Sequence, residues 1–489
     1  MPFTHVKRFF ALVLSTILLL TTFASCTKKQ GKIVDATFQE NYTLGEQVEI
    51  LPVDFRSQKK AFEGKDGDSI ELHFKNPTKL NTIVLEENGD NILQFEIAIF
   101  DEEENKFETV YQQDKVGAYR YCAFPEEKTT VAKITITKTK NNAFALHDVD
   151  VLQVEHDEDA AQHLRVAAYV VVDSVLGQNK IDEEHLDVVT DMILFGAVTF
   201  DENGHLAFND YTIDNKTIDG KTALQSLVTE IRETENGQNQ SIYINLLGPD
   251  GDIDTKEQKH NMAFKENKDV LIGEIKTLLD ELHIDGIYFD YEYPYKRSGW
   301  RAYSNFLVAL HEGLPESKKI GVALGPWGHC LSKKALEAVD YCEMMTYDLF
   351  DEEGYHATFE SAIQGINFAN RMHIPVQKCD IGLPFYGRPT DKSAFWPSYN
   401  SAATALGKFS NIDTTPREYT VEEDGKNVTA ISNENYYNGY QMIYDKTAYA
   451  LDSGIGGIMI WHYACDVPID NELSLFRAIE EAVDDRCDN

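Results

Sequence analysis

Hydrophobic and polar positions follow two different rules along this chain. Between residues 31 and 155, short segments alternate apolar with polar residues, as in Ser69–Phe74, Gln94–Phe100 and Val131–Thr137. Turn-forming residues such as Glu87–Asp90 separate these segments. Alternation is typical of strands with one buried face, and several short strands at this spacing predict an all-β sandwich.

Beyond a polar stretch at residues 156–163, which we interpret as a linker, apolar strands alternate with helix-like runs such as Asp269–Leu282. Strands that alternate with helices form parallel sheets, and eight of them close a barrel. We therefore predict an α/β chain with a (β/α)8 TIM barrel over residues 164–489. The eight predicted strands are Arg165–Val172, Met192–Phe200, Ser241–Leu247, Asp285–Glu292, Ile320–Leu324, Tyr341–Tyr347, Asp380–Phe385 and Gly457–Trp461.

Composition supports this picture and excludes some functions. With 489 residues, 43% of them hydrophobic, the chain is long enough for two or three domains and can bury their cores. Its formal net charge of −36 argues against a nucleic-acid partner, which would require a clustered cationic surface. The same charge should repel an anionic membrane except through a dedicated anchor.

The first residues supply a candidate anchor. Lys7 and Arg8 precede the apolar run Phe9–Leu20, and small residues lead from there to Cys26, the order expected of a secretory signal. The run is short for a membrane span. The four residues that end at Cys26 resemble a bacterial lipoprotein cleavage box, so we predict a signal peptide over residues 1–25 and lipidation of Cys26. The protein would then be secreted or held at a cell-envelope surface, with a plain signal peptide as the alternative.

The remaining cysteines lie singly, without the C-x-x-C or His-rich spacing of zinc and redox sites. We therefore predict no metal and no organic cofactor. One pair of cysteines could form a disulfide in an oxidising compartment, and the spacing does not say which. No sequence feature fixes the oligomeric state.

The candidate chemistry lies at the end of the fourth predicted strand. Because side chains alternate along a strand, Tyr288, Asp290 and Glu292 share one face. Two carboxylates close together in a poorly hydrated site raise one another's pKa, and a carboxyl that stays protonated beside an ionised one can act as a general acid. TIM barrels place catalytic groups at this end of their strands. The alternative is a strand end at which both acids simply reach solvent.

Asp285–Glu292 resembles the D-G-x-D-x-D-x-E signature of family 18 glycoside hydrolases, which include chitinases and endo-β-N-acetylglucosaminidases, although Tyr288 stands at the position of the middle acid. Three further strand ends resemble motifs of the same family. Met345, Tyr347 and Asp348 match M-x-Y-D, residues 382–388 match G-x-P-x-Y-G-R, and residues 456–461 match G-G-x-M-x-W. The four motifs follow the order of the predicted strands.

The resemblance implies a retaining hydrolase of β-1,4 bonds at N-acetylglucosamine, in which the acetamide oxygen of the substrate is the nucleophile. Glu292 would protonate the glycosidic oxygen, Asp290 would orient the acetamide and Tyr347 would bind its carbonyl. The substrate-binding residues would be Trp461, Met345, Asp348, Tyr386, Arg388 and Tyr288. The implied partner is a glycan that contains N-acetylglucosamine, in chitin-type oligomers or the core of N-glycans, and peptidoglycan stays open.

Tyr288 leaves a second function open. A phenol does not normally ionise near neutral pH, so we expect a tuned rate or a shifted pH optimum, with a surface glycan-binding protein of the same fold as the alternative. The order of strands in residues 31–155 resembles the discoidin or galactose-binding-like jelly roll, a module that binds sugars or spaces the enzyme in secreted glycosidases. Between Pro389 and Gly456 we expect the cleft-deepening α+β insertion of some family members to be reduced or absent.

Overall fold

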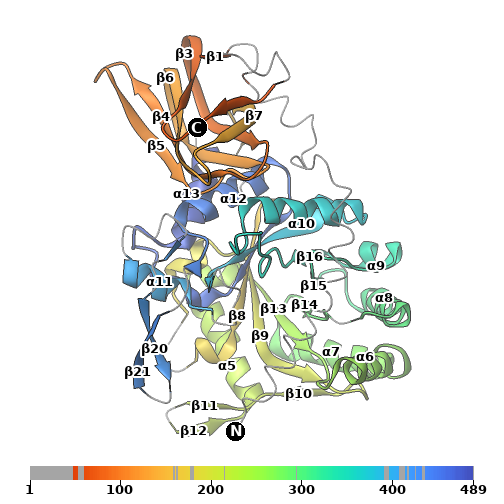
Figure 1. The fold of residues 1–489 in the computed structure, drawn as a ribbon. Coiled ribbons are helices and arrows are strands. Elements are labelled where there is room, and N and C mark those ends of the chain that lie inside the picture. Colours follow the sequence, from red (N-terminus) through yellow and green to blue (C-terminus); the bar gives the residue numbers. More distant parts are fainter. Residues whose placement is uncertain are drawn as a thin grey trace.

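The computed structural model describes residues 48–52, 60–157, 163–176, 181–213, 215–292, 294–389, 396–406 and 435–487, with residues 44 and 160 and three short strands between residues 414 and 431. An antiparallel sheet domain lies at one end of the molecule and a barrel at the other (Figure 1). The predicted signal peptide and Cys26 lie outside the described residues. None of the helices in these residues combines the length and the apolar composition that a membrane span requires.

The barrel has the eight parallel strands that the sequence predicts. Strand β8 pairs with both β9 and β23, so the sheet closes on itself. The strands are β8 (Arg165–Val171), β9 (Asp191–Phe200), β13 (Ser241–Leu247), β14 (Gly286–Phe289), β15 (Lys319–Leu324), β16 (Tyr341–Met344), β17 (Cys379–Pro384) and β23 (Gly457–Trp461). The prediction of a TIM barrel is therefore confirmed.

Two strands end three residues earlier than predicted. Phe289 is the last residue of β14 with a partner on each neighbouring strand, Leu246 on one side and Val322 on the other. Strand β16 likewise ends at Met344, paired with Ile381. The residues that follow leave the ladder at the barrel mouth. Five of the predicted site residues therefore lie on connecting segments, namely Asp290, Glu292, Met345, Tyr347 and Asp348.

Helices surround the barrel and bury the outward faces of its strands. Ile287 and Phe289 pack outward in one apolar cluster with Ile275 and Leu279, whereas Tyr243 and Met459 fill the barrel interior. The helices are α5 (Gly220–Glu233), α6 (Ile253–Asn261), α7 (Lys268–Leu282), α8 (Arg297–Gly313), α9 (Lys333–Ala338), α10 (Phe359–Arg371), α11 (Tyr399–Leu406), α12 (Tyr440–Asp452) and α13 (Leu475–Cys487). The side chains of β14 thus alternate between the outer face and the barrel interior, as the sequence predicts.

A small insertion separates β17 from α12. It contains α11, a hairpin of β20 (Glu418–Glu423) and β21 (Lys426–Ile431), and a small sheet of β18 (Arg388–Pro389), β19 (Thr414–Thr415) and β22 (Asn435–Tyr436). The α+β insertion expected to be reduced or absent is therefore reduced but present, because this interval contains a short helix and short strands.

The domain ahead of the barrel is antiparallel throughout, as predicted. Its strands are β1 (Val48–Leu51), β2 (Phe62–Gly64), β3 (Ser69–Glu87), β4 (Ile92–Asp101), β5 (Lys106–Gln113), β6 (Arg120–Thr139) and β7 (Phe144–Leu152). The first half of β3 pairs with β1 and the second half with β7, and its pairing with β6 shifts between His73 and Thr78. The long strands β3 and β6 thus join all seven strands in one sheet, and we call this unit the sandwich domain.

The sandwich domain docks on the barrel through a surface that is both apolar and charged. Tyr121 contributes to the apolar cluster of the barrel, where it packs edge-on against Tyr449. Buried Arg120 donates to Asp445 Oδ2 on α12 at 2.9 Å, and buried Arg486 on α13 donates to Thr82 Oγ1 at 2.9 Å. These contacts fix the sandwich domain against the last two helices.

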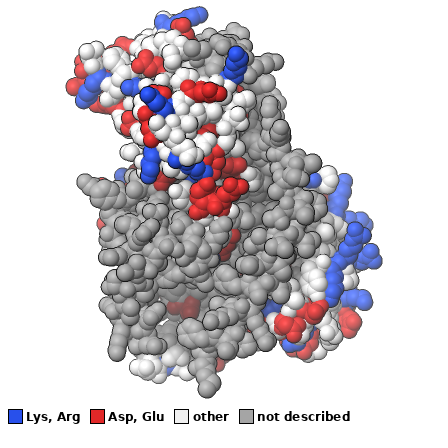
Figure 2. Space-filling view, viewed as in Figure 1, with Lys and Arg blue, Asp and Glu red and all other residues white. Residues whose placement is uncertain are grey.

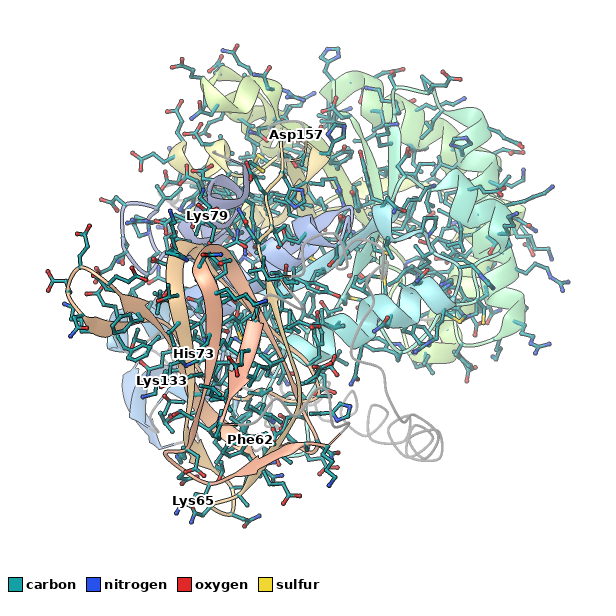
Figure 3. The ribbon with its side chains drawn as sticks, turned by 90° about the horizontal axis from the view of Figure 1, so that it is seen from above. Phe62, Lys65, His73, Lys79, Lys133 and Asp157 are labelled. Atoms are coloured by element: carbon teal, nitrogen blue, oxygen red, sulfur yellow. The ribbon has the colours of Figure 1, made fainter. Side chains whose placement is uncertain are left out.

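The outer surface of the sandwich domain carries charges of both signs. Figure 2 shows Lys and Arg interspersed with Asp and Glu on the visible face. Viewed from above, Lys65 and Phe62 lie at the far end of this domain and Lys79 lies nearer the barrel (Figure 3). The side chain of Lys79 is 53% exposed and pairs with Glu126 at 2.5 Å.

Candidate active site

The chain that leaves β14 carries two acids into the barrel mouth. The first residue of β14 is Gly286. A side chain does not fit at this position, because a Cβ would lie 2.1 Å from the carbonyl oxygen of Lys319. Asp290 and Glu292 follow the last strand residue. Asp290 Oδ1 is buried and has no hydrogen-bond partner among the described residues. A buried acceptor without a partner is costly, and is typical of a site whose partner is a ligand.

The two carboxyl groups differ in acidity. Burial raises the pKa of Asp290 to about 6. Burial, and then the nearby charges of Asp290 and Asp348, raise the pKa of Glu292 to about 8. Near pH 7 Glu292 therefore keeps its proton while Asp290 is ionised, which is the division between an acid and its anionic partner that proton transfer requires.

The raised pKa of Glu292 predicts a pH-dependent gain of stability in Glu292→Gln. The folded wild type binds this proton more tightly than the unfolded chain, so it loses stability as pH rises from the ordinary value of 4.5 to about 8. The amide does not ionise, and its advantage should grow through this window and then level off. Thermal unfolding at pH 9 should show a Tm about 2 °C or more above wild type. A difference independent of pH would contradict the assignment.

The segment after β16 adds a second group of polar side chains. Asp348 Oδ1 accepts hydrogen bonds from Tyr386 OH at 3.1 Å and from Arg388 Nη1 at 3.0 Å. Partial burial alone would raise the pKa of Asp348. The contact with His356 and the charge of Arg388 outweigh that effect, so the pKa of Asp348 is lowered. Asp348 is thus a fixed anion beside Glu292.

Aromatic side chains form one wall of the mouth. Trp461, at the end of β23, is partly exposed and packs against Tyr169 at 5.4 Å and perpendicular to Phe195 at 4.9 Å between ring centroids. In the same region, Tyr386 packs edge-on against Trp396, which is 48% exposed. Rings held this way offer apolar faces to a flat ligand such as a sugar ring.

Tyr347 and Met345 belong to the same interior cluster as Tyr386, and Trp461 packs against this cluster. Both are in the cluster that fills the upper barrel interior, at 9% and 8% exposure. The hydroxyl of Tyr347 lies 4.0 Å from the sulfur of Met459. Burial, followed by the charges of Asp290 and Glu292, raises the pKa of Tyr347 well above its ordinary value, so the phenol stays protonated and able to donate.

Tyr288 differs from its predicted role. It faces the barrel interior as the alternation predicts, but it is fully buried, and its hydroxyl accepts a hydrogen bond from Arg165 Nη1 at 2.7 Å. Its ring fills the space left by Gly321, where a Cβ would lie 2.0 Å from the ring. Tyr288 precedes Asp290 by two residues, about 6–7 Å along an extended chain, so it lies beneath the site and offers a ligand no surface.

Arg165 organises a buried charge cluster under the site. Its Nη2 contacts Asp380 and lies 2.6 Å from Glu343 Oε1, and its Nη1 lies 3.8 Å from Asp191 Oδ1. Each of these residues comes from a different strand. One guanidinium thus pairs with carboxyl groups from three strands, although burial still raises the pKa of Glu343.

Family comparison agrees with this arrangement. The family described as "Glycosyl hydrolases family 18" matches residues 165–466. This match spans more than half of the 489 residues. The chain belongs to glycoside hydrolase family 18. A search of curated proteins finds no match.

Solved structures similar to this family 18 chain include three chitinases. The chitinase ChiB from the chitin utilization locus of Flavobacterium johnsoniae is 23% identical, with a TM-score of 0.51, over 66% of this chain and 94% of that one. A chitinase from Bacteroides thetaiotaomicron is 20% identical, with a TM-score of 0.51, over 65% and 96%. A class V chitinase from Nicotiana tobaccum, in complex with NAG4, is 15% identical, with a TM-score of 0.52, over 66% and 99%. At these identities the similarity shows the fold.

The family 18 motifs of the sequence meet at one end of this barrel, with Tyr288 beneath them. Sequence reasoning missed His356 and Tyr169, which lie in no motif. It also missed Arg165, whose partners come from distant strands. Trp396 lies in no motif, and the sequence marks it only as one of several aromatic residues between β17 and β23.

One acidic group elsewhere has the spacing of metal ligands. Among the described residues, oxygens of Asp90, Asp351 and Glu353 lie within 4.8 Å of one another. The ammonium group of Lys115 contacts all three.

The cysteines form no disulfide in the described part of the chain.

Proposed function

We propose that this protein is a retaining glycoside hydrolase that cleaves β-1,4 bonds at N-acetylglucosamine by substrate-assisted catalysis. The observation that carries the proposal is the buried Asp290 Oδ1, which has no partner among the described residues and lies beside Glu292, a carboxyl whose pKa is raised by burial and by the charge of Asp290. A proton donor next to an unsatisfied buried acceptor matches a substrate with a glycosidic oxygen to protonate and an N–H to donate. The acetamido sugars have both groups.

Glu292 would act as the general acid and then as the general base. Its pKa of about 8 keeps the proton on the carboxyl near neutral pH, ready for transfer to the glycosidic oxygen as the bond breaks. The carboxylate that remains can accept a proton from the water that opens the oxazoline. The acetamide oxygen attacks the anomeric carbon from the face opposite the leaving group, and water then displaces that oxygen from the face that the leaving group vacated. The two inversions together retain the anomeric configuration.

Asp290 would orient the acetamide. Its free carboxylate oxygen can accept the acetamide N–H, which turns the carbonyl oxygen toward the anomeric carbon and supplies proximity. The negative charge of Asp290 would also stabilise the positive charge that develops on the oxazolinium ring. Tyr347, whose hydroxyl remains protonated, would donate to the acetamide carbonyl.

The remaining residues would hold the sugar at the cleavage point. Trp461 offers an aromatic face, and Met345 an apolar contact beside it. Asp348, with Tyr386 and Arg388 fixed on it, would present hydrogen-bonding groups on the opposite side.

Product analysis tests this function. The soluble chain would be incubated with chito-oligosaccharides and, separately, with a high-mannose glycoprotein, and the products identified by mass spectrometry with Glu292→Gln as the control. Disaccharide release from the oligosaccharide would assign a chitinase. Release of a glycan that leaves one N-acetylglucosamine on the protein would assign an endo-β-N-acetylglucosaminidase.

A second candidate function is favoured by Tyr288 alone. Its hydroxyl is engaged by Arg165, so no acidic group beneath Asp290 can share its proton at this position. A glycan-binding protein of the same fold that turns over poorly would bind oligosaccharide in the product assay and release nothing above the Glu292→Gln control.

Two proposals concern location and the sandwich domain. Secretion and lipid anchoring at Cys26 rest on the N-terminal sequence, and metabolic labelling with a fatty acid, lost in Cys26→Ser, would test the anchor. Sugar binding by the sandwich domain rests on its resemblance to galactose-binding-like modules.

A further inference from the structure

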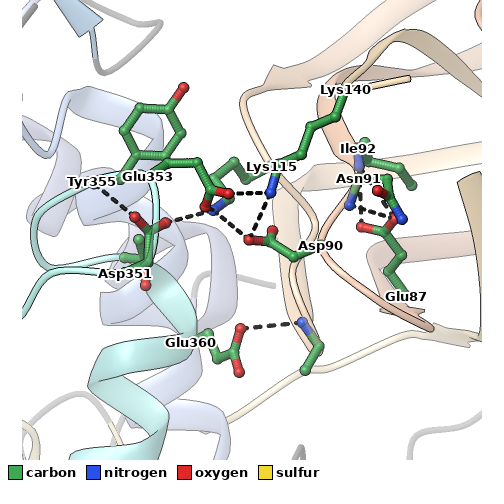
Figure 4. A network of polar contacts seen from close by, with 12 residues as sticks. Glu87, Asp90, Asn91, Ile92, Lys115, Lys140, Asp351, Glu353, Tyr355 and Glu360 are labelled. Carbon is green, nitrogen blue, oxygen red and sulfur yellow. Dashed lines mark hydrogen bonds and ion pairs between the residues drawn. The ribbon is translucent and has the colours of Figure 1, made fainter. Parts of the chain in front are cut away.

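Three loops of the sandwich domain contact the loop that follows β16 (Figure 4). Asp90 lies between β3 and β4, Lys115 between β5 and β6, and Lys140 directly after β6. Lys115 Nζ lies 2.5 Å from Asp351 Oδ2, 3.2 Å from Glu353 Oε2 and 3.0 Å from Asp90 Oδ2. Lys140 Nζ contacts Glu353 and lies 3.2 Å from Asp90 Oδ2. We call these five side chains the interdomain clamp.

Lys115 is the central cation of the clamp. Its side chain is 9% exposed, and burying an ammonium group is costly unless anions pair with it. Burial alone would lower the pKa of Lys115, but the contacts with Asp351 and Asp90 outweigh that effect and raise it. The three carboxylates lie within 4.8 Å of one another, so without Lys115 they would repel one another more than the single charge of Lys140 offsets.

The loop that carries Asp351 and Glu353 is a short hairpin. Asp351 N donates to the carbonyl of Tyr355 at 3.1 Å, and Tyr355 N donates back to Asp351 Oδ1 at 2.7 Å. Phe350 and His356 form an antiparallel bridge below this turn. The ring of Tyr355 also lies 4.9 Å from Lys115 Nζ. Asp351 therefore closes the turn with one oxygen and contacts the sandwich domain with the other.

The base of the same hairpin carries part of the candidate active site. Asp348 N donates to His356 Nε2 across the base at 2.8 Å. Asp348 and Ala357 have φ angles of 55° and 51°, a region that non-glycine residues occupy at a cost and keep only where surrounding contacts hold them. The clamp at the tip and Arg388 at the base supply such contacts.

We propose that the interdomain clamp positions this hairpin for catalysis, so that Lys115 of the sandwich domain is a positioning residue for the active site of the barrel. The inference rests on the proposed function. Without Lys115, the carboxylates of the tip repel Asp90, and Asp348 and His356 shift with the hairpin. The sandwich domain then braces one wall of the glycan pocket, in addition to any role in sugar binding or spacing.

Lys115→Met in the full chain tests the clamp, because methionine keeps most of the side-chain length and removes the charge. Amide hydrogen exchange in residues 349–357 should become about tenfold faster or more. The kcat for chito-oligosaccharide should fall about tenfold, since a misplacement of about 1 Å can cost ~10²-fold. Lys115→Arg should restore most of both values. Lys79→Met, which removes a half-exposed lysine paired with Glu126 on the same domain, should change neither.

Asp351→Asn tests the clamp from the barrel side, without any change in the sandwich domain. The amide keeps an acceptor for Tyr355 N and removes the charge that pairs with Lys115, so its hairpin should also exchange faster. Unchanged exchange in residues 349–357 of both Lys115→Met and Asp351→Asn would overturn the proposal. The exchange measurement needs no turnover, so it decides the clamp even if the wild type hydrolyses no glycan, a result that would count against the proposed function alone.

Discussion

Glu292→Gln is expected to lower the hydrolysis of chito-oligosaccharides about 10²–10⁴-fold, the usual contribution of a positioned proton donor. The amide has nearly the shape of the protonated carboxyl but cannot give up a proton to the glycosidic oxygen. Binding should persist, because Trp461, Tyr347 and Asp290 are unchanged. Product release measured by chromatography and oligosaccharide binding measured by calorimetry would separate the two effects.

The matched control for this variant is Glu337→Gln. Glu337 is a 63% exposed side chain on α9 that pairs with Lys333 at 3.7 Å. The same chemical change at this position should leave hydrolysis and binding unaltered. If Glu292→Gln hydrolysed the oligosaccharide as fast as Glu337→Gln, Glu292 would not be the proton donor.

Arg165→Met is expected to produce the largest loss of stability, about 3–5 kcal/mol. Arg165 is the cation shared by Glu343, Asp380 and Asp191, and its removal leaves buried carboxylates without compensation. Burial already raises the pKa of Glu343 against the charge of Arg165, so without Arg165 this group can escape by binding a proton and its pKa should rise further. The deficit relative to wild type should therefore be smaller at pH 5 and grow toward pH 8. Chemical denaturation at both pH values measures it.

Tyr288→Phe is the matched comparison for Arg165→Met. It removes the hydroxyl that accepts from Arg165 and keeps the ring that fills the space beside Gly321. Tyr288→Phe should lower the free energy of unfolding by about 1–3 kcal/mol, the effect of losing one buried hydrogen bond. If Arg165→Met were no more destabilising than Tyr288→Phe, or its deficit did not depend on pH, the charge cluster around Arg165 would not be what stabilises the barrel interior.

The barrel could be predicted because its signals are local. Each strand is a continuous apolar run, and helical periodicity such as that of Asp269–Leu282 separates the runs. The strand ends were placed up to three residues too late, because Asp290 and Glu292 keep the alternation of β14 after their backbone has left the ladder. Pairing of neighbouring strands, which ends β14 at Phe289, is a tertiary effect that alternation does not encode.

The candidate site could be predicted where its residues stand in order within one motif. Tyr288 shows the limit, since alternation gives its face correctly but not its depth. The contacts that explain it, Arg165 and Gly321, come from strands that only the closed barrel brings together. The clamp between Lys115 and Asp351 joins residues 236 positions apart across two domains, and lone lysines and acids in surface loops carry no signal of such a pairing.

The most direct test of the central claim is the anomeric configuration of the first product. Proton NMR spectra recorded during the first minutes of chito-oligosaccharide hydrolysis distinguish the β from the α anomer before mutarotation mixes them. Catalysis by the acetamide of the substrate, with Glu292 as acid and base, predicts that the new reducing end appears as the β anomer. An α anomer formed first would require direct attack by water on the opposite face, and would contradict the proposed roles of Asp290 and Glu292.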